Sequence, residues 1–388
     1  MPGTKSFLKR QGSRMTGFSL VELLIAMAIF GVISAAAFGL MAQHQPLFNQ
    51  QQIQAALNIS MRNSVAQLQS DIVNGGSRYY NSANVPNWPV GVVINNSVVS
   101  STQDCHSGIT YSANCFDSLT VIVSDLATTP VNPIASTTGT IPSAANAGKC
   151  VNLTTDTYND TKIYMLPPAN PPGITAATYA ANFHGPPNAD QILLVTSTGS
   201  SYTTTQLTRD GQTAVVGGTT YVVLTHGTTY ADGHNDASDD VTGMSVHSID
   251  QTGSKFCDTD WVIRLIPVKY YVDLTNTSDP QLVRQTLGYG GNTSVLADQI
   301  IGFKVGAALI NATGTTDTAT YNFDSSTFQL PSGTTGYDYT MVRSVMISLV
   351  GRTPPIEDPT YVFRNSFDGG PYQIQGISIV VNPRNMSM

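Results

Sequence analysis

The stretch GFSLVELLIAMAIFGVISAAAFGLMA, residues 17–42, decides how this chain is organised. From Phe18 to Ala42 it is apolar apart from two serines, two glycines and one carboxylate, Glu22. As a helix these 25 residues would measure about 37 Å, against roughly 30 Å of bilayer hydrocarbon. The stretch therefore predicts a transmembrane helix over residues 18–42. Its carboxylate requires an explanation, because a charge at the centre of the bilayer costs about 2.5 to 3.5 kcal/mol.

The charges that flank this helix predict its orientation. The first 17 residues contain four basic side chains and no acid, which under the positive-inside rule places them in the cytoplasm. The remaining residues, 14 basic and 25 acidic with a net charge of −11, would then lie outside the cytoplasm. Such a charge repels phosphate backbones and argues against nucleic-acid binding.

An ordinary secretory signal peptide is the alternative interpretation of the same residues. The alanines at 35–37 imitate its cleavage site, but it does not explain Glu22. Beyond the apolar run, an amphipathic pattern continues over residues 43–76, where only Pro46 interrupts the helix and Gly75-Gly76 ends it. Apolar residues at spacings of three and four predict a stripe that packs against a domain: Ile53, Leu57, Met61, Val65, Leu68 and Ile72.

The residues GFSLVELLIAMAIFGVI, 17–33, resemble the class III leader junction and N-terminal helix of type IV pilins and type II secretion pseudopilins. The resemblance implies that residues 1–17 are a leader, that prepilin peptidase cuts after Gly17, and that the new first residue, Phe18, is N-methylated. It also implies that Glu22, the fifth mature residue, serves assembly. The chemistry agrees, because a carboxylate one helical turn from a new amine can pair with the amine of a neighbouring subunit.

The periodicity changes after the helix, and residues 77–388 predict a mainly antiparallel β head. Apolar, β-branched runs between Gly, Asn, Ser and Thr clusters predict strands over 118–126, 190–198, 220–227, 261–274 and 342–352. Two proline-rich segments, 165–174 and 183–190, predict loops. Asp279-Pro280 predicts a turn, and Asp298 predicts the cap of a short helix or turn. The expected fold class is α+β: a pilin-like N-terminal helix packed on a large β head.

Two later stretches resemble one subgroup, the PilW-like minor pilins and the related PulJ/GspJ-type pseudopilins. Residues 268–309 resemble the hairpin of that group, in which a Tyr-rich strand turns into a Leu-Val-Arg strand. MVRSVMISLVGRT (341–353) and QGISIVVNPRNM (375–386) resemble its last strands. Residues 80–255 match neither pattern and are interpreted as a family-specific elaboration of the head.

The resemblance implies a minor pilin that joins an initiating, tip-located complex and primes type IV pilus assembly. Its expected partners are prepilin peptidase, other minor pilins, the major pilin and the inner-membrane assembly platform. The chain would be a single-pass inner-membrane protein with its head in the periplasm, and after assembly a part of the pilus. Two alternatives stay open: a minor pseudopilin of a type II secretion system, whose head is usually much smaller, and an adhesin or enzyme merely tethered by the helix.

All the cysteines fall on the exported side, and their even number predicts two disulfides: Cys105, Cys115, Cys150 and Cys257. The short loop between the first two favours pairing them, which leaves the other two as the second pair. Buried free thiols are the alternative, and zinc is disfavoured because the chain has no C-x-x-C pair.

No catalytic motif is present in the sequence, and the six histidines are scattered along the chain without forming a constellation, so we expect a protein that is not an enzyme. One acidic cluster in residues 230–243 offers oxygen ligands that calcium could use: Asp232, Asp236, Asp239 and Asp240. The spacing does not follow the EF-hand pattern, so the sequence favours a solvated loop and no cofactor.

Overall fold

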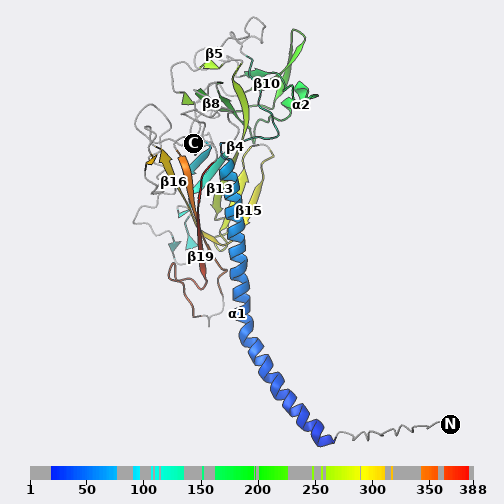
Figure 1. The fold of residues 1–388 in the computed structure, drawn as a ribbon, viewed down its shortest axis with the longest axis vertical. Coiled ribbons are helices and arrows are strands. Elements are labelled where there is room, and N and C mark those ends of the chain that lie inside the picture. The colour runs from blue at the N-terminus through cyan, green and yellow to red at the C-terminus, as the bar shows by residue number, and fades with distance from the viewer. Residues whose placement is uncertain are drawn as a thin grey trace, which may run out of the picture. The chain divides into compact units, whose positions relative to one another are not determined.

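The computed structural model describes residues 19–76, 91–96, 106–107, 110–112, 115–134, 151–152, 162–195, 197, 201–225, 247–248, 255–256, 259–288, 290–310, 316–317, 342–356 and 362–383 (Figure 1). The chain divides into two compact units, residues 1–56 and residues 57–388. The first unit holds the N-terminal part of helix α1. The second holds the rest of α1 and the β head.

Helix α1 spans Leu20–Asn74 and includes Pro46, so the proline does not end it. Within the head unit its core-facing side chains follow the predicted spacing. Exposed fractions are 8% or less for Leu57, Met61, Val65, Leu68 and Ile72. Ile53, predicted to belong to the same stripe, lies in the N-terminal unit and is 43% exposed. The helix ends at Gly75-Gly76 as expected, and the φ of Gly76 is 68°, a conformation that favours glycine.

The largest sheet has eight antiparallel strands and is centred on β13 (Trp261–Asp273). Its main path runs β1 (Val92–Asn95), β4 (Ser118–Ser124), β13, β7 (Gln191–Val195), β8 (Ser201–Gln206) and β11 (His247–Ser248). Strand β14 (Gln281–Thr286) also pairs with β13, and β15 (Thr293–Ala297) pairs with β14. Because β4 and β7 flank β13, residues 80–255 contribute directly to the main sheet.

Pro267 lies inside this central strand. On one side, β4 pairs with β13 across the proline; on the other, β7 pairs with residues 261–265 and β14 with residues 268–273. The carbonyl of Pro267 accepts a hydrogen bond from Leu287 N, 2.8 Å, on the side of β14. Since the N and O of one residue face the same neighbour in an antiparallel ladder, the missing N–H faces the junction between β7 and β14, where the ladder is interrupted.

A second sheet has the order β17 (Thr316–Asp317), β16 (Ile300–Ile310), β18 (Val342–Arg352) and β19 (Ile374–Val381). The head half of α1 and both sheets share one hydrophobic core. Leu68, Phe303 and Leu349 are members with no exposed surface. Each such side chain stabilises the fold by about 1.5 to 3 kcal/mol through burial.

A smaller module packs around a second hydrophobic core, to which Ile192 and Leu194 of β7 and Val262 of β13 also contribute. Strands β6 (Lys162–Met165), β10 (Thr219–Thr225) and β9 (Gln212–Val216) form a three-stranded sheet, and helix α2 (Ala176–Ala180) packs with it around the buried Tyr179. Thr175 starts α2 with a capping box. Two short strand pairs complete the described head: β2 (His106–Ser107) with β3 (Thr110–Tyr111), and β5 (Val151–Asn152) with β12 (Lys255–Phe256).

The α+β class expected from the sequence is confirmed, and each of the five predicted strands is present as β4, β7, β10, β13 or β18. Helix α2, between the two proline-rich segments, was not predicted. Asp298 begins a turn and not a helix, because β16 starts at Ile300 and the intervening Gln299 has a φ of 58°. The Asp298 carboxylate accepts a hydrogen bond from Gln281 Nε2, 2.8 Å.

Candidate functional site at the N-terminal helix

Helix α1 begins with a reciprocal cap formed by Ser19 and Glu22. Glu22 N donates to Ser19 Oγ (3.2 Å), and Ser19 N donates to Glu22 Oε2 (3.0 Å). This capping box satisfies two backbone donors that a helix start otherwise leaves unpaired, and a negative charge there also suits the helix dipole. Glu22 therefore has a structural role within its own chain. Its second oxygen, Oε1, has no hydrogen-bond partner among the described residues.

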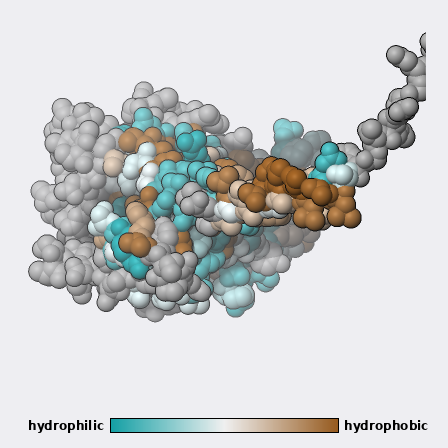
Figure 2. Space-filling model, turned by 90° about the horizontal axis from the view of Figure 1, so that it is seen from below, coloured by the Kyte–Doolittle hydropathy of each residue, from teal (hydrophilic) through white to brown (hydrophobic). Residues whose placement is uncertain are grey.

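The segment Leu20–Ala42 is long and apolar enough to cross a membrane by length and composition. Its large apolar side chains are exposed in the single chain, as at Phe30 (72%) and Met41 (70%). Figure 2 shows them as a continuous hydrophobic surface on the helix. Such a surface lies outside the cores that the described residues form and is available to lipid or to other helices.

Serine hydroxyls attach the head half of α1 to the first sheet. Ser64 Oγ donates to Leu296 O at 3.1 Å, and Ser60 Oγ, one turn earlier, donates to the same carbonyl at 3.4 Å. Leu296 lies on β15, so the helix is bonded to the edge strand of that sheet.

Asp71 makes a second attachment, one turn before the end of the helix. Its Oδ2 accepts from Tyr270 OH (2.5 Å) and from Arg284 Nε (2.9 Å). Tyr270 has no exposed surface, and burial, with the neighbouring Asp71 carboxylate, raises its pKa, so the phenol remains a donor at neutral pH. Two adjacent strands, β13 and β14, thus hold one carboxylate of α1 and fix the rotation of the helix on the sheet.

The end of the helix lies against the segment that leads into β1. A Cβ atom on Gly91 would lie 2.6 Å from Gly76 N, closer than real Cβ contacts come. Gly76 N also donates to Ile122 O, 2.9 Å. Glycine at position 91 therefore permits the backbone approach that fixes the end of the helix beside β4.

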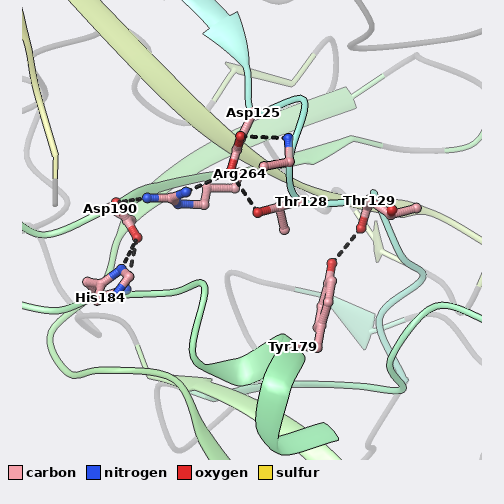
Figure 3. A network of polar contacts seen from close by, with 8 residues as sticks. Asp125, Thr128, Thr129, Tyr179, His184, Asp190 and Arg264 are labelled. Carbon is pink, nitrogen blue, oxygen red and sulfur yellow. Dashed lines mark hydrogen bonds and ion pairs between the residues drawn. The ribbon is translucent and has the colours of Figure 1, made fainter. Parts of the chain in front are cut away.

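A polar cluster within the head surrounds Arg264 of β13 (Figure 3). The guanidinium lies between two buried carboxylates, with Nη1 2.6 Å from Asp125 Oδ2 and Nη2 2.8 Å from Asp190 Oδ1. His184 donates its backbone N–H to Asp190 Oδ2 at 2.8 Å. Thr128 Oγ1 donates to Asp125 Oδ2 at 2.6 Å.

The charges of this cluster are mutually stabilised. Burial favours the neutral form of Asp125, but hydrogen bonds from Thr128, Ala127 and Arg264 outweigh it and hold the pKa below its ordinary value. Burial also opposes the charge of Arg264, and Asp190 and Asp125 raise its pKa instead. The cluster ties the end of β4 and the segment before β7 to β13, which is a structural role.

The structure describes only some of the predicted site residues. Glu22 is described at the start of α1. Gly17, Phe18 and the candidate calcium loop lie outside the described residues, as do Cys105, Cys150 and Cys257, while Cys115 is buried at 6% exposure. The disulfides and the calcium site stay predictions. The described part of the chain contains no group of three or more side chains that could hold a metal ion.

Reasoning from the sequence did not predict two features of the helix. The pattern Ser-x-x-Glu before an apolar run is the signature of a capping box and would have identified the pairing of Ser19 with Glu22. Asp71 lies next to the apolar stripe, but its partners come from strands about two hundred residues further along the chain, and no local pattern predicts them.

The prokaryotic N-terminal methylation motif matches residues 12–38 of this chain. The match includes Gly17, Phe18, the capping box and most of the apolar segment. It supports a type IV pilin or a type II secretion pseudopilin, and it implies processing by prepilin peptidase and assembly with other pilins. The N-terminal apolar helix is consistent with a single-pass membrane anchor. Comparison with curated proteins and with solved structures finds no match.

Proposed function

We propose that this chain is a PilW-type minor pilin that is cut after Gly17, N-methylated at Phe18 and built into an initiating complex at the pilus tip. The observation that carries the proposal is the methylation motif in register with a capped carboxylate and an exposed apolar helix. Cleavage would create an amine at Phe18, four residues before Glu22 in the sequence. A neighbouring subunit would offer a similar amine.

The mechanism is assembly and not catalysis. Glu22 Oε2 accepts from Ser19 N, while Oε1 is open among the described residues and can accept the amine of a neighbour. That pairing reduces the cost of keeping a carboxylate near hydrocarbon, so it favours insertion next to another subunit. The apolar surface of α1 supplies lateral packing. The head, held to its part of the helix at Ser64 and Asp71, presents the surfaces that select partners.

The test uses the full chain in cells that carry its own assembly machinery. Mass spectrometry of the N-terminal peptide should find N-methylated Phe18, and an N-terminus near Phe38 would indicate an ordinary signal peptide instead. Glu22→Ala should be methylated yet absent from sheared filaments. The matched variant Glu22→Gln keeps the capping pattern and removes the charge, so its loss from filaments would assign the effect to charge pairing.

Assembly as the function is refuted if filaments form and contain the chain after both Glu22→Ala and Gly17→Val. The alternative, a minor pseudopilin of a type II secretion system, rests on the same motif. Deletion of the gene separates the two, because the pilus proposal expects loss of surface pili with protein secretion unchanged.

A further inference from the structure

Strand β19 forms an edge of the second sheet. Among the described residues its neighbour is β18, and all eight residues of β19 pair with it in unbroken register. Its sequence, IQGISIVV, contains no charged residue and no proline. Natural proteins usually protect an edge strand by charge, proline, a bulge or shortness, and β19 has none of these.

The opposite edge of the second sheet is formed by β16, whose last two residues pair with β17. Hydrogen bonds of Asp117 and Asn96 with Phe303 and Val305 cap part of the remainder. Among the other edge strands, β1 and β15 have four and five residues, and β11 and β17 have two each. Strand β19 offers eight uncharged residues in one row along the edge, and within the described part of the chain no side chain caps them as Asp117 and Asn96 cap β16. An unprotected edge of this kind is suited to receive a further strand.

The side chains of β19 leave the core partly uncovered at this edge. Ile377 and Ile379 pack against the main core but are only half-buried. Val380, which faces outward, is 51% exposed. A Cβ atom on Gly376 would have Leu349 O, at 3.8 Å, as its nearest neighbour, so the outer face beside this strand is open. An added strand would complete the burial of the two isoleucines.

We propose that β19 is a strand-addition site, occupied by an extended, uncharged, β-branched segment of another subunit of the same assembly. The inference rests on the proposed function, because it takes the neighbour to be a pilin-type subunit. The exported part of this chain carries a net charge of −11, so contact through an uncharged strand minimises repulsion if the partner is also acidic. Backbone hydrogen bonds would give affinity, and the side chains facing Ile377 and Ile379 would give specificity.

The position of β19 argues against a second copy of this chain as the partner. Gln375, near its start, pairs with Gly351, where a Cβ atom would lie 2.9 Å from Leu57 Cδ1 and from Met61 Sδ. The strand thus starts at the end of the head where α1 enters. If β19 of two copies paired antiparallel about a two-fold axis, the points at which α1 enters the two heads would lie at opposite ends of the joint sheet. Chains anchored in one membrane enter their heads from the same side, so a different subunit fits better.

The test compares two lysine variants of the full chain, expressed in cells with the native machinery. Val380→Lys places a charge on the β19 edge, and Val295→Lys places one on β15, where the valine is equally exposed at 50%. A photo-crosslinking amino acid at Ser378, an exposed residue of β19, reports contact. We expect adducts with a subunit that bears an N-methylated N-terminus, mapped to one extended segment. Val380→Lys should lower their yield about tenfold and Val295→Lys should not, because a charged lysine on an edge strand hinders the addition of another strand.

Several results would overturn this inference. They are an unchanged adduct yield in Val380→Lys, an equal loss in Val295→Lys, adducts only with a second copy of the chain, or no adduct from a chain that enters filaments. Thermal unfolding of both variants within a few degrees of the parent protein controls for folding. The proposed function fails separately, if Phe18 is not N-methylated or if Glu22→Ala enters filaments normally.

Discussion

Replacing Asp71 with alanine should loosen the attachment of α1 to the first sheet and lower the free energy of unfolding by about 1.5 to 3 kcal/mol. The hydroxyl of the fully buried Tyr270 would lose its acceptor, 2.5 Å away, at a cost of about 1 to 2 kcal/mol. Arg284 would lose its carboxylate, but its side chain is 23% exposed and can be rehydrated, so its share is about 0.5 to 1 kcal/mol.

A double-mutant cycle with Tyr270→Phe tests this reasoning. Phenylalanine has no hydroxyl that could lose its acceptor, so Asp71→Ala should cost about 1 kcal/mol less in the Tyr270→Phe background than in the parent protein. Denaturant unfolding of the full chain in detergent, followed by tryptophan fluorescence, measures all four proteins. The exposed neighbour Ser70→Ala is the control and should change stability by less than about 0.5 kcal/mol. Strict additivity, or a cost below about 0.5 kcal/mol for Asp71→Ala, would refute the proposed attachment.

Three further predictions concern the cap, the helix end and the Arg264 cluster. Ser19→Ala should destabilise the first turn of α1 by about 1 kcal/mol and reduce the chain in sheared filaments, by immunoblot, without changing N-methylation. Gly91→Ala sets a methyl group 2.6 Å from Gly76 N, which should lower the free energy of unfolding by about 2 kcal/mol. Calorimetry should show this as a lower Tm. Because the pKa of Asp125 is lowered in the folded state, its contribution is complete above the ordinary carboxyl pKa of about 4 and is lost as the pH falls through the folded value. In the Asp125→Asn variant, Tm should therefore fall less steeply as the pH is lowered into the acid range. An unchanged fall in Tm would contradict this prediction.

The sequence was most informative where a single element determines its own structure. The apolar run, the stripe from Leu57 to Ile72 and the strands with continuous β-branched runs follow from local periodicity, and all are present. The position of Pro267 in a central strand and the contacts of Arg264 depend on the order in which distant strands pair, which no local pattern specifies. At the candidate site, the assembly role that we propose for Glu22 rests on a motif. Its role as a cap was missed, although the local pattern Ser-x-x-Glu, from Ser19 to Glu22, is the signature of that pairing.

The separate core of the small module makes it a practical place for a label. Strands β9 and β10 join through Gly217-Gly218, whose φ values of 56° and 85° suit a tight turn, and no atom lies within 4 Å of a Cβ built on either residue. Val215, beside this turn, is 71% exposed. An epitope or small fluorescent tag inserted at the turn would extend into solvent, and among the described residues the core around α1 shares no member with the core of this module. Individual subunits could then be counted and followed in living cells while the N-terminus stays native.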